Sequence, residues 1–141
     1  MRFSKVLFLC SIFTFLYSQN ILSITNVDTS AGTLDMYMEN TDAVGGFQFG
    51  LAGIDVTGAS GGSAADAGFT VSTSSTTILG FSFTGATIPA GEGTLVSVLF
   101  DGFVDSICLD GLVMSSSEGT ALDFDLGDCY SVTFGCTDDS A

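Results

Sequence analysis

The chain has 141 residues, of which sixteen are Asp or Glu, two are Lys or Arg and none is His, so its formal net charge is −14. Both cations, Arg2 and Lys5, lie near the start, and every later residue lacks a side-chain base. This composition excludes mechanisms that need a general-base histidine, a Schiff-base lysine or a phosphate-clamping arginine, and it excludes nucleic acid and anionic membranes as partners.

Residues 1–19 have the order of an export signal. Arg2 and Lys5 precede the apolar run Val6–Tyr17, and polar residues follow at Ser18. The run is shorter than the roughly 20 residues that a membrane-spanning helix needs, and a buried core helix would not account for the two leading cations. We therefore expect a signal peptide over residues 1–19, cleaved after Ser18 or Gln19, and a secreted, extracellular or cell-surface location with no membrane insertion after cleavage.

Cys10 lies inside the expected signal, so three cysteines remain in the mature chain: Cys108, Cys129 and Cys136. An odd number in a secreted chain predicts one internal disulfide and one thiol that pairs elsewhere. A zinc site is the weaker interpretation because the chain has no His and no CxxC spacing.

The apolar content of 46 %, with thirteen Phe, is enough for a folded core despite the high charge. A mature chain of about 120 residues corresponds to one domain. Its negative charges repel one another, and salt screens such repulsion. A marine or otherwise saline habitat would suit this composition.

Alternating apolar and polar residues predict short strands throughout the mature chain. In residues 33–39, Leu34, Met36 and Met38 fall on one face, and Asp35, Tyr37 and Glu39 fall on the other. The same alternation recurs in Phe47–Leu51, Leu79–Phe83 and Leu122–Leu126. Residues 94–100 are apolar at most positions, which predicts a central strand covered on both faces. Two more strands are expected at 107–109 and 130–134, and shorter ones at 22–27 and 69–73.

Clusters of Gly and Asx separate these segments and predict turns at 40–42, 58–62 and 90–93. Residues 63–67 are sufficient for one helical turn at most. Many short strands with Gly-rich turns indicate an all-β fold, a two-sheet antiparallel β-sandwich over residues 20–134.

Three segments resemble cohesin domains and their carbohydrate-binding relatives. Gly45–Leu51 is similar to the "agfqfdl" strand of cohesins, Gly93–Phe100 to their "G-x-L-x-x-I-x-F" strand, and Leu112–Leu122 to their closing "v-x-s-d-x-x-G-x-x-l" turn. The resemblance extends over roughly residues 22 to 134 in the family's order, and its motifs mostly report core packing. It implies a jelly-roll sandwich of the cohesin type.

The resemblance also implies a disulfide between Cys108 and Cys129, because the cohesin strand order makes their segments neighbours. It further implies a non-catalytic extracellular binding or scaffolding module with a dockerin-like protein partner. The alternatives are a carbohydrate-binding module for a polysaccharide, and a structural spacer in a large surface protein. The "Tyr-Asp-Pro" that usually follows the "fqfdl" strand is replaced by Ala52–Asp55, and no dockerin-contacting motif is recognisable, so no binding residue is assigned.

Residues 135–141 resemble the opening of the Cys-bearing "GCTDxxACNY" repeats of secreted marine bacterial proteins. The resemblance implies that a following Cys-containing module starts at residue 135. The alternative is a frayed acidic tail that carries Cys136 as a stray thiol.

Acidic residues suggest two kinds of chemistry, metal binding and glycoside hydrolysis. Asp123, Asp125 and Asp128 could contribute oxygen ligands to Ca²⁺, but a solvated sheet face explains them as well, so we expect no metal site and no cofactor, with Ca²⁺ as the alternative. A glycosidase-type carboxylate pair is disfavoured, since the chain has no Trp and no imidazole or cationic support. We therefore expect no catalytic residue and no enzyme activity. Tyr37 is the best outward-facing aromatic residue for contact with a sugar.

Overall fold

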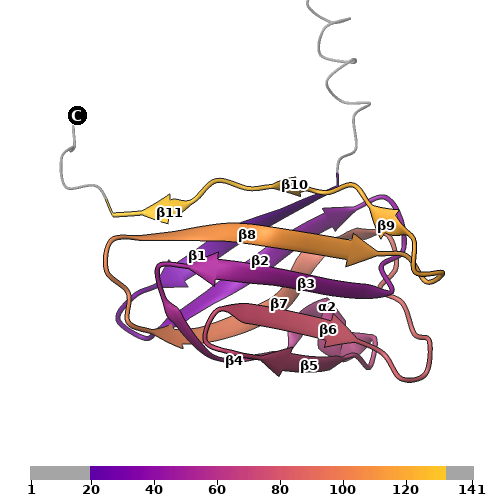
Figure 1. Cartoon of the computed structure of the whole chain (residues 1–141), viewed down its shortest axis with the longest axis horizontal. Coiled ribbons are helices and arrows are strands. Elements are labelled where there is room, and N and C mark those ends of the chain that lie inside the picture. The colour runs from indigo at the N-terminus through magenta and orange to yellow at the C-terminus, as the bar shows by residue number, and fades with distance from the viewer. Residues whose placement is uncertain (1–19, 133–141) are drawn as a thin grey trace, which may run out of the picture.

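The alternating segments form the strands of two facing sheets in the computed structural model, which describes residues 20–132 (Figure 1). The first sheet has the order β10-β1-β2-β7-β4, and the second has the order β11-β8-β3-β6-β5 with β9 added beside β8. All pairs are antiparallel except the parallel pair of β1 and β10. The expected all-β, two-sheet sandwich is confirmed, while the predictions for residues 1–19 and 133–141 lie outside the described residues.

The first sheet consists of β1 (Ile21–Asp28), β2 (Thr33–Asn40), β4 (Asp55–Ser60), β7 (Gly91–Asp101) and β10 (Asp125–Leu126). The second consists of β3 (Gly46–Ala52), β5 (Thr70–Thr73), β6 (Thr77–Phe81), β8 (Ser106–Ser115), β9 (Ala121–Leu122) and β11 (Tyr130–Ser131). One short helix, α2 (Gly62–Asp66), follows β4 and buries Ala64. It is the single helical turn that the sequence predicted. Among residues 20–132, no helix is long and apolar enough to cross a membrane.

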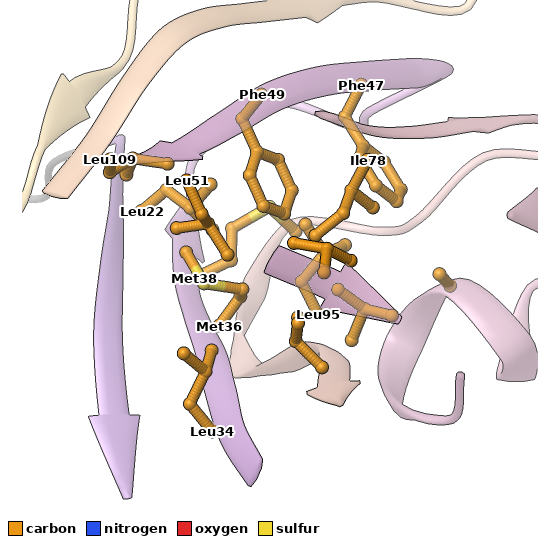
Figure 2. Close-up of a cluster of buried hydrophobic side chains, with 14 of the residues drawn as sticks. Leu22, Leu34, Met36, Met38, Phe47, Phe49, Leu51, Ile78, Leu95 and Leu109 are labelled. Carbon is orange, nitrogen blue, oxygen red and sulfur yellow. The ribbon is translucent and has the colours of Figure 1, made fainter. Parts of the chain in front are cut away.

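The core lies between the two sheets (Figure 2). Leu34, Met36 and Met38 project inward from β2, as their alternation predicted, and they are fully or almost fully buried. Phe47 and Phe49 project inward from β3. Burying a side chain of this size stabilises the fold by about 1.5–3 kcal/mol. The sandwich therefore depends mainly on the apolar residues of these alternating strands.

The prediction for Leu79–Phe83 was wrong about which face is buried. On β6 the inward residues are Ile78 and Gly80, whereas Leu79 is 38 % exposed and Phe83, just beyond the strand, is 83 % exposed. The ring of Phe47 occupies the space in front of Gly80. Because this ring fills the core there, the larger side chains of this segment lie outside.

The strand at residues 94–100 pairs with β2 on one side and β4 on the other, so its central position is confirmed. The prediction that both faces are covered was wrong, because Leu99 faces outward and is 50 % exposed. Leu95 and Val96 are consecutive and both buried because the register between β2 and β7 shifts at this point. A bulge of this kind turns two neighbouring side chains towards one face.

Residues 122–126 do not form one strand. Leu122 lies in β9 and pairs with β8, whereas Asp125 and Leu126 lie in β10 and pair with β1 of the other sheet. The chain thus crosses from one sheet to the other and returns to β8 at β11. Two predicted turns were also displaced, because residues 58–60 belong to β4 and residues 91–93 belong to β7.

Candidate binding face

The outer surface of the β8-β3-β6-β5 sheet is built from three rows of residues that lie directly opposite one another. Figure 1 shows β8, β3 and β6 of this sheet in front of the other one. The central row is Val113, Gln48, Leu79 and Ser72, in the order of the strands. The row on one side of it is Ser115, Gly46, Phe81 and Thr70, and the row on the other side is Asp110, Gly50 and Thr77. We call these eleven residues the binding face.

The binding face is low in relief along β3, because Gly46 and Gly50 carry no side chain. A Cβ atom at Gly46 would lie 3.2 Å from Oγ of Ser115, and a Cβ atom at Gly50 would collide with the carboxylate of Asp110. The Asp110 side chain therefore lies across β3. A shallow hollow of about 230 Å³ beside it is lined by Gln48, Gly50, Thr77 and Gly111 among others. Among the β3 residues of this face, only Gln48 has a side chain that projects towards a partner.

Apolar side chains flank Gln48 on both sides. Val113 on β8 is 55 % exposed, and Leu79 on β6 lies on the other side of Gln48. The rings of Phe81 and Phe83 meet edge to face, with centroids 5.0 Å apart, at the end of β6. Exposed apolar groups that gather in one place mark interaction surfaces more often than scattered ones do.

Charge separates the two outer surfaces of the sandwich. The rows of the binding face contain one carboxylate, Asp110, although the described chain is strongly acidic. On the opposite sheet, two pairs of acidic residues lie directly across from each other: Glu39 with Glu92, and Asp55 with Asp101. Like charges in such cross-strand positions repel. A partner that covers the binding face therefore removes fewer charged groups from water than one that covers the opposite sheet.

Tyr37 lies on the acidic surface, on the outward face of β2 as predicted. Partial removal from water raises the pKa of its phenol, and a hydrogen bond to the Glu92 carboxylate and the charges of Glu92 and Glu39 raise this pKa further. Nearby, Asp35 accepts hydrogen bonds from Oγ of Ser97 at 2.7 Å and from Nδ2 of Asn26 at 2.9 Å. These side chains hold one another in place on the acidic surface.

The structure contains the disulfide between Cys108 and Cys129. Cys108 lies on β8, and Cys129 lies between β10 and β11 in the segment that crosses between the sheets. The bond therefore ties this crossing segment to β8.

The three aspartates considered for Ca²⁺ do not converge. Within residues 20–132 no group of three or more Asp, Glu or Cys side chains is placed to hold a metal ion. The backbone carbonyl of Asp123 accepts a hydrogen bond from Asn20, and the backbone N–H of Asp125 donates one to the carbonyl of Asn20. This segment thus anchors the start of β1.

The sequence did not reveal the binding face. The motif around Val113 predicts a closing turn, and the alternation around Leu79 predicts a core position. The one available signal was the Gly at position 80 between Leu79 and Phe81, since a Gly inside a strand often marks a close approach by another group. This signal does not identify Phe47 as the group that approaches Gly80.

No protein-family model and no curated protein matches the sequence. Several solved structures are similar in fold. A non-cellulosomal cohesin from the hyperthermophilic archaeon Archaeoglobus fulgidus has a TM-score of 0.58 and 16 % identity, over 78 % of this chain and 87 % of its own. The CaDoc0917–CaCohA2 complex crystallised at pH 5.5 contains a chain with a TM-score of 0.57 and 13 % identity, over 82 % of this chain and 100 % of its own.

A third similar chain belongs to a type I cohesin–dockerin complex from Clostridium thermocellum, with a TM-score of 0.53 and 14 % identity, over 79 % of this chain and 93 % of its own. The chain therefore has a cohesin-like β-sandwich fold, as its motifs implied.

Proposed function

We propose that this chain is a non-catalytic binding module that holds a protein partner against its binding face. The proposal rests on the contrast between the two outer surfaces. One is acidic, whereas the other is nearly uncharged and exposes Leu79 and Val113. Depletion of charge with apolar residues at the centre is the pattern of interface cores.

The partner class that best fits is a dockerin-like protein, since one of the similar structures is a cohesin–dockerin complex. No residue after Lys5 is cationic, so any ion pair across the interface takes its positive charge from the partner. A basic rim on the partner would approach faster at low salt than at high salt.

The proposal includes secretion. The Arg2 and Lys5 pair ahead of an apolar run supports a signal peptide over residues 1–19, and the Cys108–Cys129 disulfide suits an oxidising compartment. The likeness of residues 135–141 to a Cys-bearing repeat supports a further module after the sandwich. Catalysis is not part of the proposal, because no residue after Lys5 is one of the His, Lys and Arg groups that usually drive it.

A carbohydrate-binding module remains the alternative, with less support. The chain has no Trp, and the Phe81 and Phe83 rings stand at 87° to each other rather than forming a coplanar platform. The spacer alternative leaves the uncharged face without a role. The proposal requires no cofactor or metal ion.

The decisive experiment places a charge on the binding face. Val113→Asp and Leu79→Asp change exposed side chains, and each should weaken capture of a dockerin-like partner by about tenfold or more, the usual effect at a buried apolar anchor. Leu99→Asp, at an apolar position on the opposite sheet whose exposure of 50 % lies between those of Leu79 and Val113, is the matched control and should bind normally.

Calorimetry with dockerin proteins from the source organism measures the affinity, and circular dichroism checks that each variant is folded. Binding that survives Val113→Asp but is lost with Leu99→Asp would place the interface on the acidic sheet. Retention on polysaccharide with no affinity for any dockerin would support the carbohydrate-binding alternative.

A further inference from the structure

One edge of β7 is only partly covered. β7 pairs with β2 from Gly91 to Leu99, but β4 pairs with its other edge only from Ser97 to Asp101. After Ser60 the chain turns away into α2, and Gly62 packs against the backbone carbonyls of Thr94 and Leu95. Among residues 20–132 the start of β7, residues 91–93, has no strand partner on this edge and makes no backbone hydrogen bond outside the β2 ladder.

A groove of about 510 Å³ lies along this open edge. Helix α2 contacts β7, and its last residue, Asp66, lines the groove together with the next residue, Ala67. Glu92 of β7 also borders the groove, and its carboxylate accepts a hydrogen bond from Tyr37 on the outer face of the sheet. The lining also includes Met38 and Ile88, two buried residues of the core. The groove thus has two apolar core residues in its lining and two acidic residues at its border.

The backbone at the edge is accessible at close range. Gly91 and Gly93 have φ values of 151° and 154°, and a Cβ atom added to either would meet nothing within 4 Å. Gly in a strand permits another backbone to approach closely, and an uncovered strand edge is a template for an added strand. This is the geometry of recognition by strand addition, in which main-chain hydrogen bonds provide affinity and pockets select alternate side chains.

We propose that the groove binds an extended, basic segment of a partner protein, which pairs with β7 at residues 91–93 and places Lys or Arg side chains against Asp66 and Glu92. One apolar side chain of the segment would contact the base formed by Met38 and Ile88. The acidic end of this chain, with Asp138 and Asp139, has the wrong charge to occupy the groove of a second copy. This site lies at a sheet edge and does not involve the binding face.

The test uses the protein purified after export and a capped five-residue peptide of alternating lysine and valine. Amide NMR shifts should change at residues 91–93 and in α2 when the peptide is added. The same peptide N-methylated at alternate residues loses the main-chain N–H donors along one edge, and the version methylated on the edge that faces β7 should not bind. A peptide of alternating glutamate and valine should not bind either, because its charges match those of the groove.

Variants separate the groove from the rest of the surface. Asp66→Asn combined with Glu92→Gln should weaken binding about fivefold, as expected for two partly exposed ion pairs. Ala67→Trp should block the groove and abolish binding. Asp101→Asn, at the far end of β7, and Val113→Asp, on the binding face, are controls that should leave peptide affinity unchanged.

Equal affinity for the N-methylated peptide, or full binding to Ala67→Trp, would overturn the proposal. A concentration-dependent dimer that dissociates on Ala67→Trp would identify a second copy as the occupant and would also overturn it. Because Val113→Asp tests the binding face and Ala67→Trp tests the groove, failure of one proposal leaves the other standing.

Discussion

The ring of Phe47 on β3 lies directly against the backbone of Gly80 on the neighbouring strand β6. A Cβ atom added at Gly80 would overlap three carbon atoms of this ring. The ring is held in place, since it stacks on Phe49 with centroids 6.0 Å apart and on Phe69 with centroids 6.1 Å apart. It is also almost completely buried.

Gly80→Ala should therefore lower the free energy of unfolding by about 1–3 kcal/mol, the usual cost of overpacking a core. Urea unfolding followed by circular dichroism measures it. Gly58→Ala is the matched control, because a Cβ atom there would meet Cδ1 of Leu99 at an ordinary 3.7 Å. Adding Phe47→Leu to Gly80→Ala should recover part of the loss. A Gly80→Ala variant as stable as the parent would contradict the contact.

The same contact explains where strand prediction succeeded and failed. On β2 the outward residues are Asp35, Tyr37 and Glu39, so polarity identified the buried face. The segment at β6 has apolar residues at Ile78, Leu79 and Phe81, which lie on both faces of the strand. The pattern there indicates a strand but does not show which face is buried. A shift of one residue moves every side chain to the opposite face. The contact with Phe47, which is distant in sequence, places Gly80 on the core side of β6.

The sequence did not predict the binding face, for a related reason. Val113 and Leu79 become neighbours only because both strands pair with β3 at Gln48. The absence of cations after Lys5 predicted an acidic protein, but it did not predict that one sheet would carry almost none of the charge. That distribution depends on strand register. By contrast, the Cys108–Cys129 pairing followed from the cohesin-like strand order.

Loss of the Cys108–Cys129 disulfide should lower the free energy of unfolding by about 3 kcal/mol, because the bond closes a loop across 21 positions and restricts the unfolded chain. Unfolding curves of the paired variant Cys108→Ser/Cys129→Ser, compared with the parent, measure the effect. Cys136→Ser is the control and should leave both the bond and the stability unchanged. Non-reducing peptide maps that join Cys129 to Cys136 would refute the pairing.

Tyr37 should titrate above its ordinary pKa of 10.0, since partial desolvation and the carboxylates of Glu92 and Glu39 disfavour the phenolate. The unfolded chain then ionises first, so the contribution of the protonated phenol to stability is complete below about pH 10 and is lost as pH rises through the folded pKa. Carbon-13 NMR of the labelled Tyr ring measures the pKa, with Tyr37→Phe to assign the signal.

Glu92→Gln should bring the Tyr37 pKa back towards 10.0, because it removes the carboxylate that is hydrogen-bonded to the phenol. Asp101→Asn, on the same strand at its other end, should change it less. A pKa that is unaffected by Glu92→Gln would show that the Glu92 carboxylate does not contribute to the shift.

Stability should increase with salt. No Lys, Arg or His follows Lys5, so the side chains of residues 20–132 cannot form salt bridges, and the facing pairs Glu39 with Glu92 and Asp55 with Asp101 are purely repulsive. Screening shortens the reach of such repulsion from about 30 Å at 0.01 M to about 10 Å at 0.1 M, so the melting temperature should rise up to about 0.5 M NaCl.

Calorimetry at several NaCl concentrations checks this rise, and Glu39→Gln gives it a residue-level test. Removing one charge of a facing pair should raise the melting temperature at low salt, and this gain should shrink as NaCl screens the parent protein. Ser72→Asn, an uncharged exposed change on the other sheet, is the control. Because Asp123, Asp125 and Asp128 form no metal-binding group, CaCl₂ should act no more strongly than NaCl at equal ionic strength. A melting temperature that is flat or falls with NaCl would show that charge repulsion does not limit this fold.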